Sequence, residues 1–335
     1  VVSTKFGSGA YGEGKPSAEA RIVRTAAFLA FTLSLPFVIG VLILSEWLVD
    51  AFNVPAASRD EAVLALRFGT IALQLSFLSG VINTPQLSRL RMDLNSLING
   101  GLRTVSVVAT PIVIYLGAGI SGATFTVLVV NAIALIAHVI ISGKLLKELF
   151  GLSIDKSVIY PMLKLGFGLV FAALGTILLS NIEKGLLPRF VSVDALAHYS
   201  VAFALAGMMM LFSAAMTQSL IPAFSQLQGC EQRHSRNTLY SRAIRMNLIL
   251  VPPASVILLV LAKPFFTIWA GEDFARESIV PFYILLCGLL FSIPSFLPYV
   301  TIVSAGRTDV LAKLYLLELP LYFAVTATLI FFFGT

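Results

Sequence analysis

Charged side chains are scarce in this chain, and their scarcity excludes a soluble globular protein. Asp, Glu, Lys and Arg make up only 12% of the 335 residues, whereas 58% are hydrophobic and 25 are phenylalanine. Soluble domains carry about a quarter charged residues. The composition indicates a membrane protein, so the net charge of +6 is not evidence for a nucleic-acid partner.

Cysteine and histidine are also rare. The two cysteines, Cys230 and Cys287, provide neither a disulfide framework nor the spacing of a metal site, and we expect both to be structural. His138 and His198 have no partner at a ligand spacing, so we expect packing roles for them. The chain also lacks a Walker loop, a His-Glu-x-x-His motif and a dinucleotide fingerprint. We therefore predict no catalytic residue, no metal site and no cofactor.

Nine apolar runs are long enough to cross a hydrocarbon core, which takes about 20 helical residues. They are continuous, whereas strands of a membrane barrel alternate over about ten residues. We predict an all-α polytopic membrane protein with about nine transmembrane helices, at residues 25–49, 62–84, 95–116, 119–143, 162–182, 195–222, 243–267, 279–304 and 310–333.

Basic residues alternate between the two predicted sides of the membrane. All but six of the 23 lie in one set of segments, namely the N-terminal leader, 85–103, 144–164, 226–245 and 305–313. By the positive-inside rule this set is cytoplasmic. We therefore expect the N-terminal end of the chain inside and its C-terminal end outside.

The sequence also indicates an internal duplication. Arg21-Ile-Val-Arg24 corresponds to Arg242-Ala-Ile-Arg245, and Arg91-Met92-Asp93 corresponds to Arg307-Thr308-Asp309, at nearly the same offset. Pro36 and Pro252 fall at matching depths. Such symmetry is typical of transporters built from two repeats.

The duplication predicts the extent of the complete protein. The chain begins with Val, and under the repeat the partners of its fifth and sixth helices should lie before residue 1 and the partner of its fourth helix after residue 335. We expect two parallel six-helix bundles, of which this chain is a truncated form. Residues 1–150 would form an N-terminal bundle without its first two helices, and 151–335 a C-terminal bundle without its last helix or helices.

Several segments resemble one known family. The run Ser180-Asn-Ile-Glu-Lys-Gly-Leu-Leu-Pro-Arg-Phe190, followed by Tyr199-Ser-Val-Ala202, resembles the seventh and eighth helices of polysaccharide-repeat flippases in the MOP superfamily. Similar segments are Leu116–Ala123, Ile221–Ser225 and Gly306–Asp309. The chain departs from the family where Glu183 replaces the commoner Asp and Pro188 replaces a Gly.

The resemblance implies a MOP/MATE-like fold and a function in polysaccharide biosynthesis. Its substrate would be a polyisoprenoid-pyrophosphate-linked oligosaccharide, flipped by alternating access across a bacterial inner membrane. Partners would be this lipid-linked oligosaccharide and membrane lipid, and contact with polysaccharide assembly proteins is left open. Coupling to protons or sodium is also left open.

A flippase needs inward-facing polar residues, because each uncompensated charge in a membrane costs several kcal/mol. Three of them, Asn95, Asn99 and Arg103, follow i, i+4, i+8 and share one helical face. They either line the path, or the Asn side chains bond neighbouring helices while Arg103 reaches the interface. The candidate path residues are Gln74, Asn83, Asn95, Asn99, Arg103, Gln218, Asn247 and Glu318.

Charged residues provide the other candidates. Glu318, deep in its helix, either pairs with a cation or couples transport to an ion. Glu183 and Lys184 form an outer gate or head-group contact, or else a solvated helix end. Arginines at two equivalent helix starts either bind pyrophosphate or only reflect topology; these are Arg21, Arg24, Arg242 and Arg245.

Two other functions are considered. A MATE-like drug or cation exporter would share the architecture but have an acidic cavity. Arg67, Arg103 and Lys164 against Glu318 favour a cationic one. A membrane polysaccharide polymerase or ligase would need a long outer loop with Arg and His, and the longest outer connection here, around 183–194, contains no His.

Overall fold

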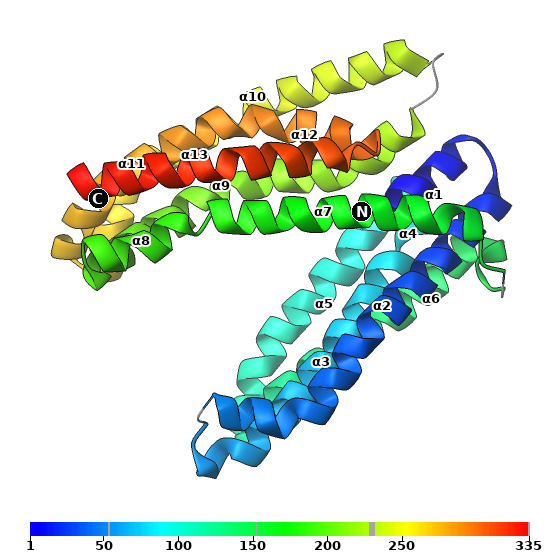
Figure 1. Ribbon diagram of the computed structural model, residues 1–335, viewed down its shortest axis with the longest axis horizontal. Coiled ribbons are helices and arrows are strands. Elements are labelled where there is room, and N and C mark those ends of the chain that lie inside the picture. The colour runs from blue at the N-terminus through cyan, green and yellow to red at the C-terminus, as the bar shows by residue number, and fades with distance from the viewer. Residues whose placement is uncertain (53, 152, 228–231, 334–335) are drawn as a thin grey trace. The chain divides into compact units, whose positions relative to one another are not determined.

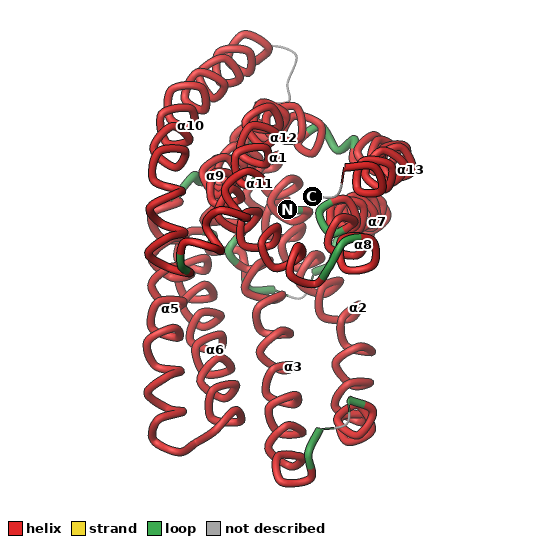
Figure 2. The backbone as a smooth tube through the Cα atoms, turned by 90° about the vertical axis from the view of Figure 1, so that its left-hand side faces the viewer, coloured by secondary structure: helices red, strands yellow, loops and turns green. Residues whose placement is uncertain are grey.

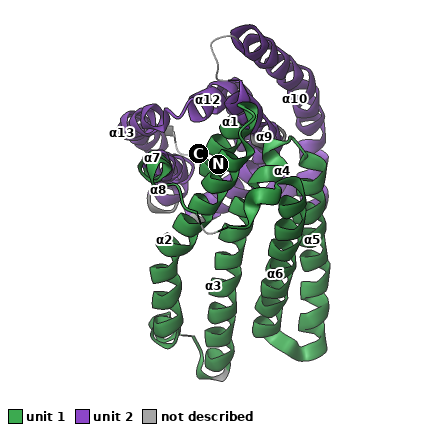
Figure 3. Ribbon diagram, turned by 90° about the vertical axis from the view of Figure 1, so that its right-hand side faces the viewer, with its two compact units in different colours: residues 1–163 green, residues 164–335 purple. Residues whose placement is uncertain are grey.

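The computed structural model is almost entirely helical (Figure 1). It describes residues 1–335 except 53, 152, 228–231 and 334–335. Within these residues there is no strand, and Figure 2 shows helices joined by short loops. The described chain divides into two compact units, Val1–Leu163 and Lys164–Thr335 (Figure 3). The assignment of the bundles to 1–150 and 151–335 stays a prediction.

Unit 1 contains six helices and the start of a seventh. They are α1 (Val2–Gly12), α2 (Pro16–Ala51), α3 (Arg59–Ile82), α4 (Thr84–Ser88), α5 (Met92–Val113), α6 (Gly119–Leu145) and the first turns of α7 (Lys156–Leu179). Helix α3 packs against α2 and α6, and α5 packs against α6. The short α1 lies against α2 and α4.

Unit 2 contains the rest of α7 and six further helices. They are α8 (Ile182–Phe190), α9 (Val193–Gln226), α10 (Arg233–Ala270), α11 (Glu272–Ser292), α12 (Phe296–Ser304) and α13 (Thr308–Phe333). Helix α9 packs against α11 and α12. Its small side chains, Ala202 and Ala206, pack against large ones such as Phe266 and Phe282, which allows close helix approach in a membrane.

The nine predicted spans are all helical. Eight helical stretches of the described chain are long and apolar enough to cross a membrane. One of them, Met92–Leu145, includes both α5 and α6, which pack against each other. The predicted span 279–304 differs from one continuous helix, because a 3₁₀ turn at Ile293–Ser295 separates α11 from α12. Pro294 explains this break, since it removes a backbone donor.

The carboxylate of Glu61 stabilises the turn at which the chain reverses direction between α5 and α6. The turn places Gly117 at φ 87° and Gly119 at φ 60°, where a side chain is strained. Glu61 of α3 accepts hydrogen bonds from the backbone N–H groups of Ile120 and Ser121. These are orphan donors of the first turn of α6, so Glu61 caps this helix from a neighbouring one.

The two units share a backbone turn at the positions that the duplication relates. At the end of α4, Leu90 N–H donates to Leu87 O (3.0 Å) and Arg91 N–H to Gln86 O (2.9 Å). At the end of α12, Gly306 N–H donates to Val303 O (2.9 Å) and Arg307 N–H to Ile302 O (3.0 Å). Both are Schellman motifs. The sequence separation between Leu90 and Gly306 equals that between Pro36 and Pro252.

The residue in the left-handed conformation differs between the two turns. It is Gly306 (φ 78°) in unit 2 and Leu90 (φ 55°) in unit 1, the only non-glycine residue of the described chain with positive φ. An arginine and an aspartate follow in each case and form an ion pair, Arg91–Asp93 at 2.8 Å and Arg307–Asp309 at 3.4 Å. The local geometry of the motif is therefore conserved between the units.

We expect opposite responses from the two turns. Gly306→Leu lowers the stability of the protein by about 1 kcal/mol, because a Cβ is unfavourable in the left-handed region. Leu90→Gly is neutral or stabilising, since relief of that strain offsets the greater freedom of the unfolded chain. The thermal unfolding midpoints of the purified variants in detergent measure both effects. An unchanged midpoint for Gly306→Leu contradicts the assignment.

Candidate functional site

Hydrogen-bonded side chains connect three helices within unit 1. Asn83, which follows α3, donates from Nδ2 to Oδ1 of Asn95 in α5 (3.1 Å). Asn99, one turn later, donates to the same oxygen (2.8 Å). Its own Oδ1 lies 3.3 Å from Nε2 of His138 in α6. The predicted polar face of α5 therefore lies against polar groups of its neighbours.

The connection continues beyond His138. Its Nδ1 contacts the carboxamide of Gln86 in α4, whose Nε2 lies 3.1 Å away and also donates to Oγ of Ser142 (3.1 Å). We call these six residues, from Asn83 to Ser142, the polar chain of unit 1. Gln86, His138 and Ser142 are fully buried, Asn83 is nearly so, and Asn99 is exposed. His138 is fully buried, in keeping with the predicted packing role, and both of its ring nitrogens also have polar partners, which the sequence did not predict.

Arg103 lies outside this polar chain. Its side chain is exposed and has no hydrogen bond or ion pair with any residue that the structure describes. Asn95 and Asn99 both contact polar groups outside α5, as the alternative of bonds to neighbouring helices predicts. For Asn99 and Arg103, which are exposed on the same helical face, a role in lining the path stays a prediction.

Gln74 connects α3 to α2. Ser34 donates from Oγ to Oε1 of Gln74 (2.6 Å). The Nε2 of Gln74 is buried and has no partner within the described part of the chain, and the same holds for Oδ1 of Asn83. Unsatisfied groups of this kind are costly. Both therefore mark places where a polar ligand or water would be stabilised.

Glu183 is the centre of a polar cluster in unit 2. It lies in the first turn of α8, where the helix dipole favours a carboxylate. Tyr322 of α13 donates its hydroxyl to Oε1, and Tyr199 of α9 interacts with the same carboxylate. We call these three residues the Glu183 cluster. Oε2 is buried and has no hydrogen-bond partner in the described structure, so Glu183 is not a solvated helix end.

Lys184 has different partners from its neighbour. Its Nζ donates to Oδ1 of Asn181 (3.2 Å) and lies 4.8 Å from the centre of the Phe203 ring. Glu318 is exposed on α13, one turn before Tyr322, which it influences electrostatically. No described cation pairs with Glu318. Its predicted roles in ion pairing and coupling therefore have no support from the contacts within unit 2.

The remaining path candidates lie at the α9–α10 contact. Asn247 is buried and accepts a hydrogen bond from Ser213 Oγ (2.8 Å), so it joins the two helices. Gln218 belongs to α9, but its side chain lies outside the described part of the structure.

The four arginines at equivalent helix starts have different environments. Arg21 lies 3.9 Å from Asp155, whose pKa is lowered mainly by hydrogen bonds from Ser157 and less by Arg21. Arg24 donates to the Ala20 carbonyl (3.2 Å). Arg242 lines a cavity of about 360 Å³ with His234 and Thr238, and Arg245 is exposed. Pyrophosphate binding by these residues stays a prediction.

The sequence did not predict the buried ion pair between Glu19 and Arg89. Arg89 donates from Nη1 and Nη2 to the two carboxylate oxygens of Glu19 (2.9 and 3.2 Å). The Glu19 side chain is 0% exposed and that of Arg89 16%. Arg89 also donates to the Pro85 carbonyl (3.0 Å) and lies over the Tyr11 ring. This pair joins the start of α2 to α1 and the end of α4, and no spacing in the sequence relates its members.

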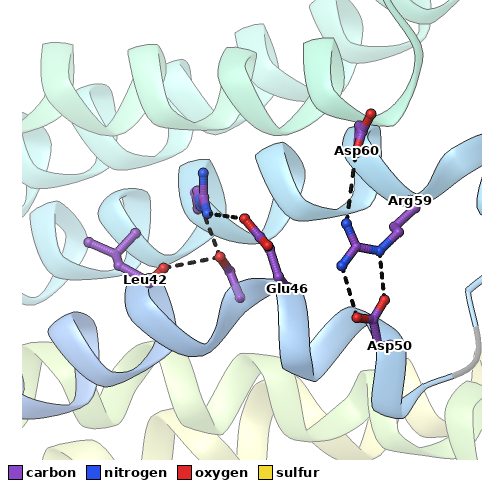
Figure 4. Close-up of polar contacts among 7 residues, drawn as sticks. Leu42, Glu46, Asp50, Arg59 and Asp60 are labelled. Carbon is purple, nitrogen blue, oxygen red and sulfur yellow. Dashed lines mark hydrogen bonds and ion pairs between the residues drawn. The ribbon is translucent and has the colours of Figure 1, made fainter.

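A second group of ion pairs lies between the end of α2 and the start of α3 (Figure 4). Arg59 binds both carboxylate oxygens of Asp50 (2.7 and 2.8 Å). Arg67 donates to Glu46 (3.3 Å) and to the buried Ser45 (2.8 Å). Arg67 is therefore a paired residue. It no longer supports the prediction of a net cationic cavity.

We expect the Glu19–Arg89 pair to contribute strongly to stability. Glu19→Ala leaves a mostly buried guanidinium without its counter-ion, so the free energy of unfolding falls by about 3 kcal/mol. Glu13→Ala is the control, because Glu13 forms a solvent-exposed pair with Lys15 at 2.8 Å and such pairs contribute little. Thermal unfolding in detergent measures both, and equal midpoints for the two variants would contradict the prediction.

Solved structures of other proteins share this arrangement of helices. The structure superposes on a MATE in the straight conformation with a TM-score of 0.80 and 13% identity, covering 99% of this chain and 82% of that chain. The Vibrio cholerae MATE transporter VcmN in the bent form gives a TM-score of 0.79 and 16% identity, covering 99% of this chain and 77% of that chain. The chain thus has the MATE-like fold that was predicted, and its long apolar helices indicate a multi-pass membrane protein.

The family follows from the sequence itself. The profile of a family described as "Polysaccharide biosynthesis protein" matches residues 14–279. The chain belongs to this polysaccharide biosynthesis family, which agrees with the resemblance noted above. A search of curated proteins finds no match. No group of three or more His, Cys, Asp or Glu suited to a metal ion is present in the described chain.

Proposed function

We propose that the protein flips a polyisoprenoid-pyrophosphate-linked oligosaccharide repeat unit from the cytoplasmic to the outer face of a bacterial inner membrane. The observation that carries this proposal is the match to a polysaccharide biosynthesis family over residues 14–279 in a chain with a transporter fold. The basic helix ends would face the cytoplasm, in keeping with the positive-inside rule.

The polar face of α5 supports this function physically. A glycan head group loses many hydrogen bonds to water in a membrane, and side-chain carboxamides and a guanidinium can replace them. Asn99 and Arg103 are exposed on α5. Contacts with Asn95 and His138 of the polar chain of unit 1 orient the Asn99 carboxamide. The exposed part of this face would contact the head group during alternating access.

A MATE-like exporter is the second candidate, favoured by the fold alone. Charge does not separate the two, because Arg67 is paired and Glu183 adds an acid to unit 2. The family match favours polysaccharide precursors. The MATE-like fold, rather than the family match, makes a polymerase or ligase the weakest alternative.

The Glu183 cluster would couple transport to an ion. A carboxylate with one oxygen bound to Tyr322 and the other buried without a partner in the described structure is unstable as an isolated anion in a membrane. It would be stabilised by a proton or by a sodium ion. We therefore propose Glu183, in place of Glu318, as the group that binds the coupling ion.

Flipping is tested genetically and biochemically. Deleting the gene in its host should cause lipid-linked repeat units to accumulate on the cytoplasmic face, and the complete gene should restore export. Arg103→Ala should reduce export without loss of the protein from the membrane, and Lys15→Ala serves as a control, because Lys15 is an exposed cation outside the α5 face. Unchanged export without accumulation in the deletion strain contradicts the proposal.

Coupling is tested with the protein in proteoliposomes under an imposed proton or sodium gradient. Glu183→Gln should abolish the acceleration of transport by the gradient, because the amide cannot take up the ion. Glu183→Asp should retain part of it, and Glu318→Gln should leave it unchanged. Loss of the gradient response in Glu318→Gln but not in Glu183→Gln would refute the assignment.

A further inference from the structure

A cavity with several polar side chains in an otherwise apolar wall lies at the N-terminal end of α10, within unit 2. It has a volume of about 410 Å³, and its walls come from the ends of α9 and α12 and the first turns of α10. This volume is within the usual range for small-molecule sites. Its lining includes Phe224, Arg236, Asn237, Tyr240, Thr301 and Ser304.

One wall of the cavity is rich in hydrogen-bond donors. Arg236, Asn237 and Tyr240 occupy neighbouring positions on α10, and Arg236 and Tyr240 are both half-buried. None of the three side chains has a hydrogen-bond or ion-pair partner in the described structure. Their guanidinium, carboxamide and phenol groups are therefore available to one ligand.

The opposite wall offers acceptors. Thr301 of α12 donates its hydroxyl proton to the Pro298 carbonyl (2.8 Å). Its oxygen can therefore still accept a hydrogen bond, while its proton is already engaged. A ligand that combines acceptor oxygens with a hydroxyl group of its own would satisfy both walls.

Among the residues that the structure describes, the charge at the cavity is positive. Arg236 is the charged residue of the lining, and neither α10 nor α12 contains an Asp or Glu. Glu231, which precedes α10 in the sequence, lies outside the described residues. The nearest acid that follows α12, Asp309, is paired with Arg307 (3.4 Å). The N-terminus of α10 adds a partial positive charge. An anionic ligand would therefore be favoured.

We infer that this cavity binds a phosphate ester, with Arg236 as the principal contact. Phosphate presents several oxygens in a tetrahedral arrangement, which suits donors that converge from guanidinium, carboxamide and phenol groups better than a planar carboxylate does. The cavity has room for a hydroxyl-bearing head group beyond the phosphate. The source is either a membrane lipid or a soluble phosphate compound.

The inference is independent of transport, because it concerns binding alone. Full-length protein in detergent is titrated with phosphatidylglycerol, a polyisoprenyl pyrophosphate and inorganic pyrophosphate, with diacylglycerol as the phosphate-free control. Native mass spectrometry measures the bound fraction. At least one of the three phosphate probes should bind, diacylglycerol should not, and the probe that binds identifies the source.

Variants of α10 locate the binding. Arg236→Gln should weaken it about tenfold or more, because a charge-assisted hydrogen bond is lost. Arg236→Lys should recover part of it, and Tyr240→Phe should weaken it by a smaller factor. Arg233→Gln is the matched control, since Arg233 lies on the same helix but outside the cavity lining. Equal binding by the wild type, Arg236→Gln and Arg233→Gln overturns the inference, as does binding of none of the three probes.

Discussion

In hydrocarbon a polar side chain is stable only with a partner, and this constraint organises both units. Asn83, Asn95, Asn99, His138, Gln86 and Ser142 meet it collectively in the polar chain of unit 1. Glu61 meets it by capping α6, and Glu19 by binding Arg89. Most of these contacts join different helices, so satisfying polar groups also helps to determine which helices pack together.

The exceptions to the constraint are informative because they are few. A buried carboxylate oxygen of Glu183 and the amide of Gln74 remain unsatisfied in the described structure. Exposed or half-buried cations without partners among the described residues occur at Arg103 and Arg236. Transport proteins need such groups, since a site already satisfied by the protein has nothing to offer a substrate or ion. The proposals made above all rest on groups of this kind.

The helices could be predicted from sequence because a membrane span needs a continuous apolar run, which is a local property. The shared face of Asn95 and Asn99 was likewise predictable from their i, i+4 spacing. The hydrogen-bond partners of His138 were not predicted, because Gln86 and Asn99 lie 52 and 39 residues away in the sequence. The Glu19–Arg89 pair spans 70 residues. Partners at such separations depend on tertiary packing, and no single-sequence pattern specifies them.

The Schellman turns after α4 and α12 bear on the predicted duplication. A turn that normally depends on glycine persists in unit 1 with leucine at the left-handed position. Leu90 is exposed, so the backbone hydrogen bonds of the turn, rather than packing of its side chain, hold the conformation that the residue itself disfavours. The predicted duplication would then be easier to detect in backbone dihedral angles and hydrogen-bond registers than in residue identity.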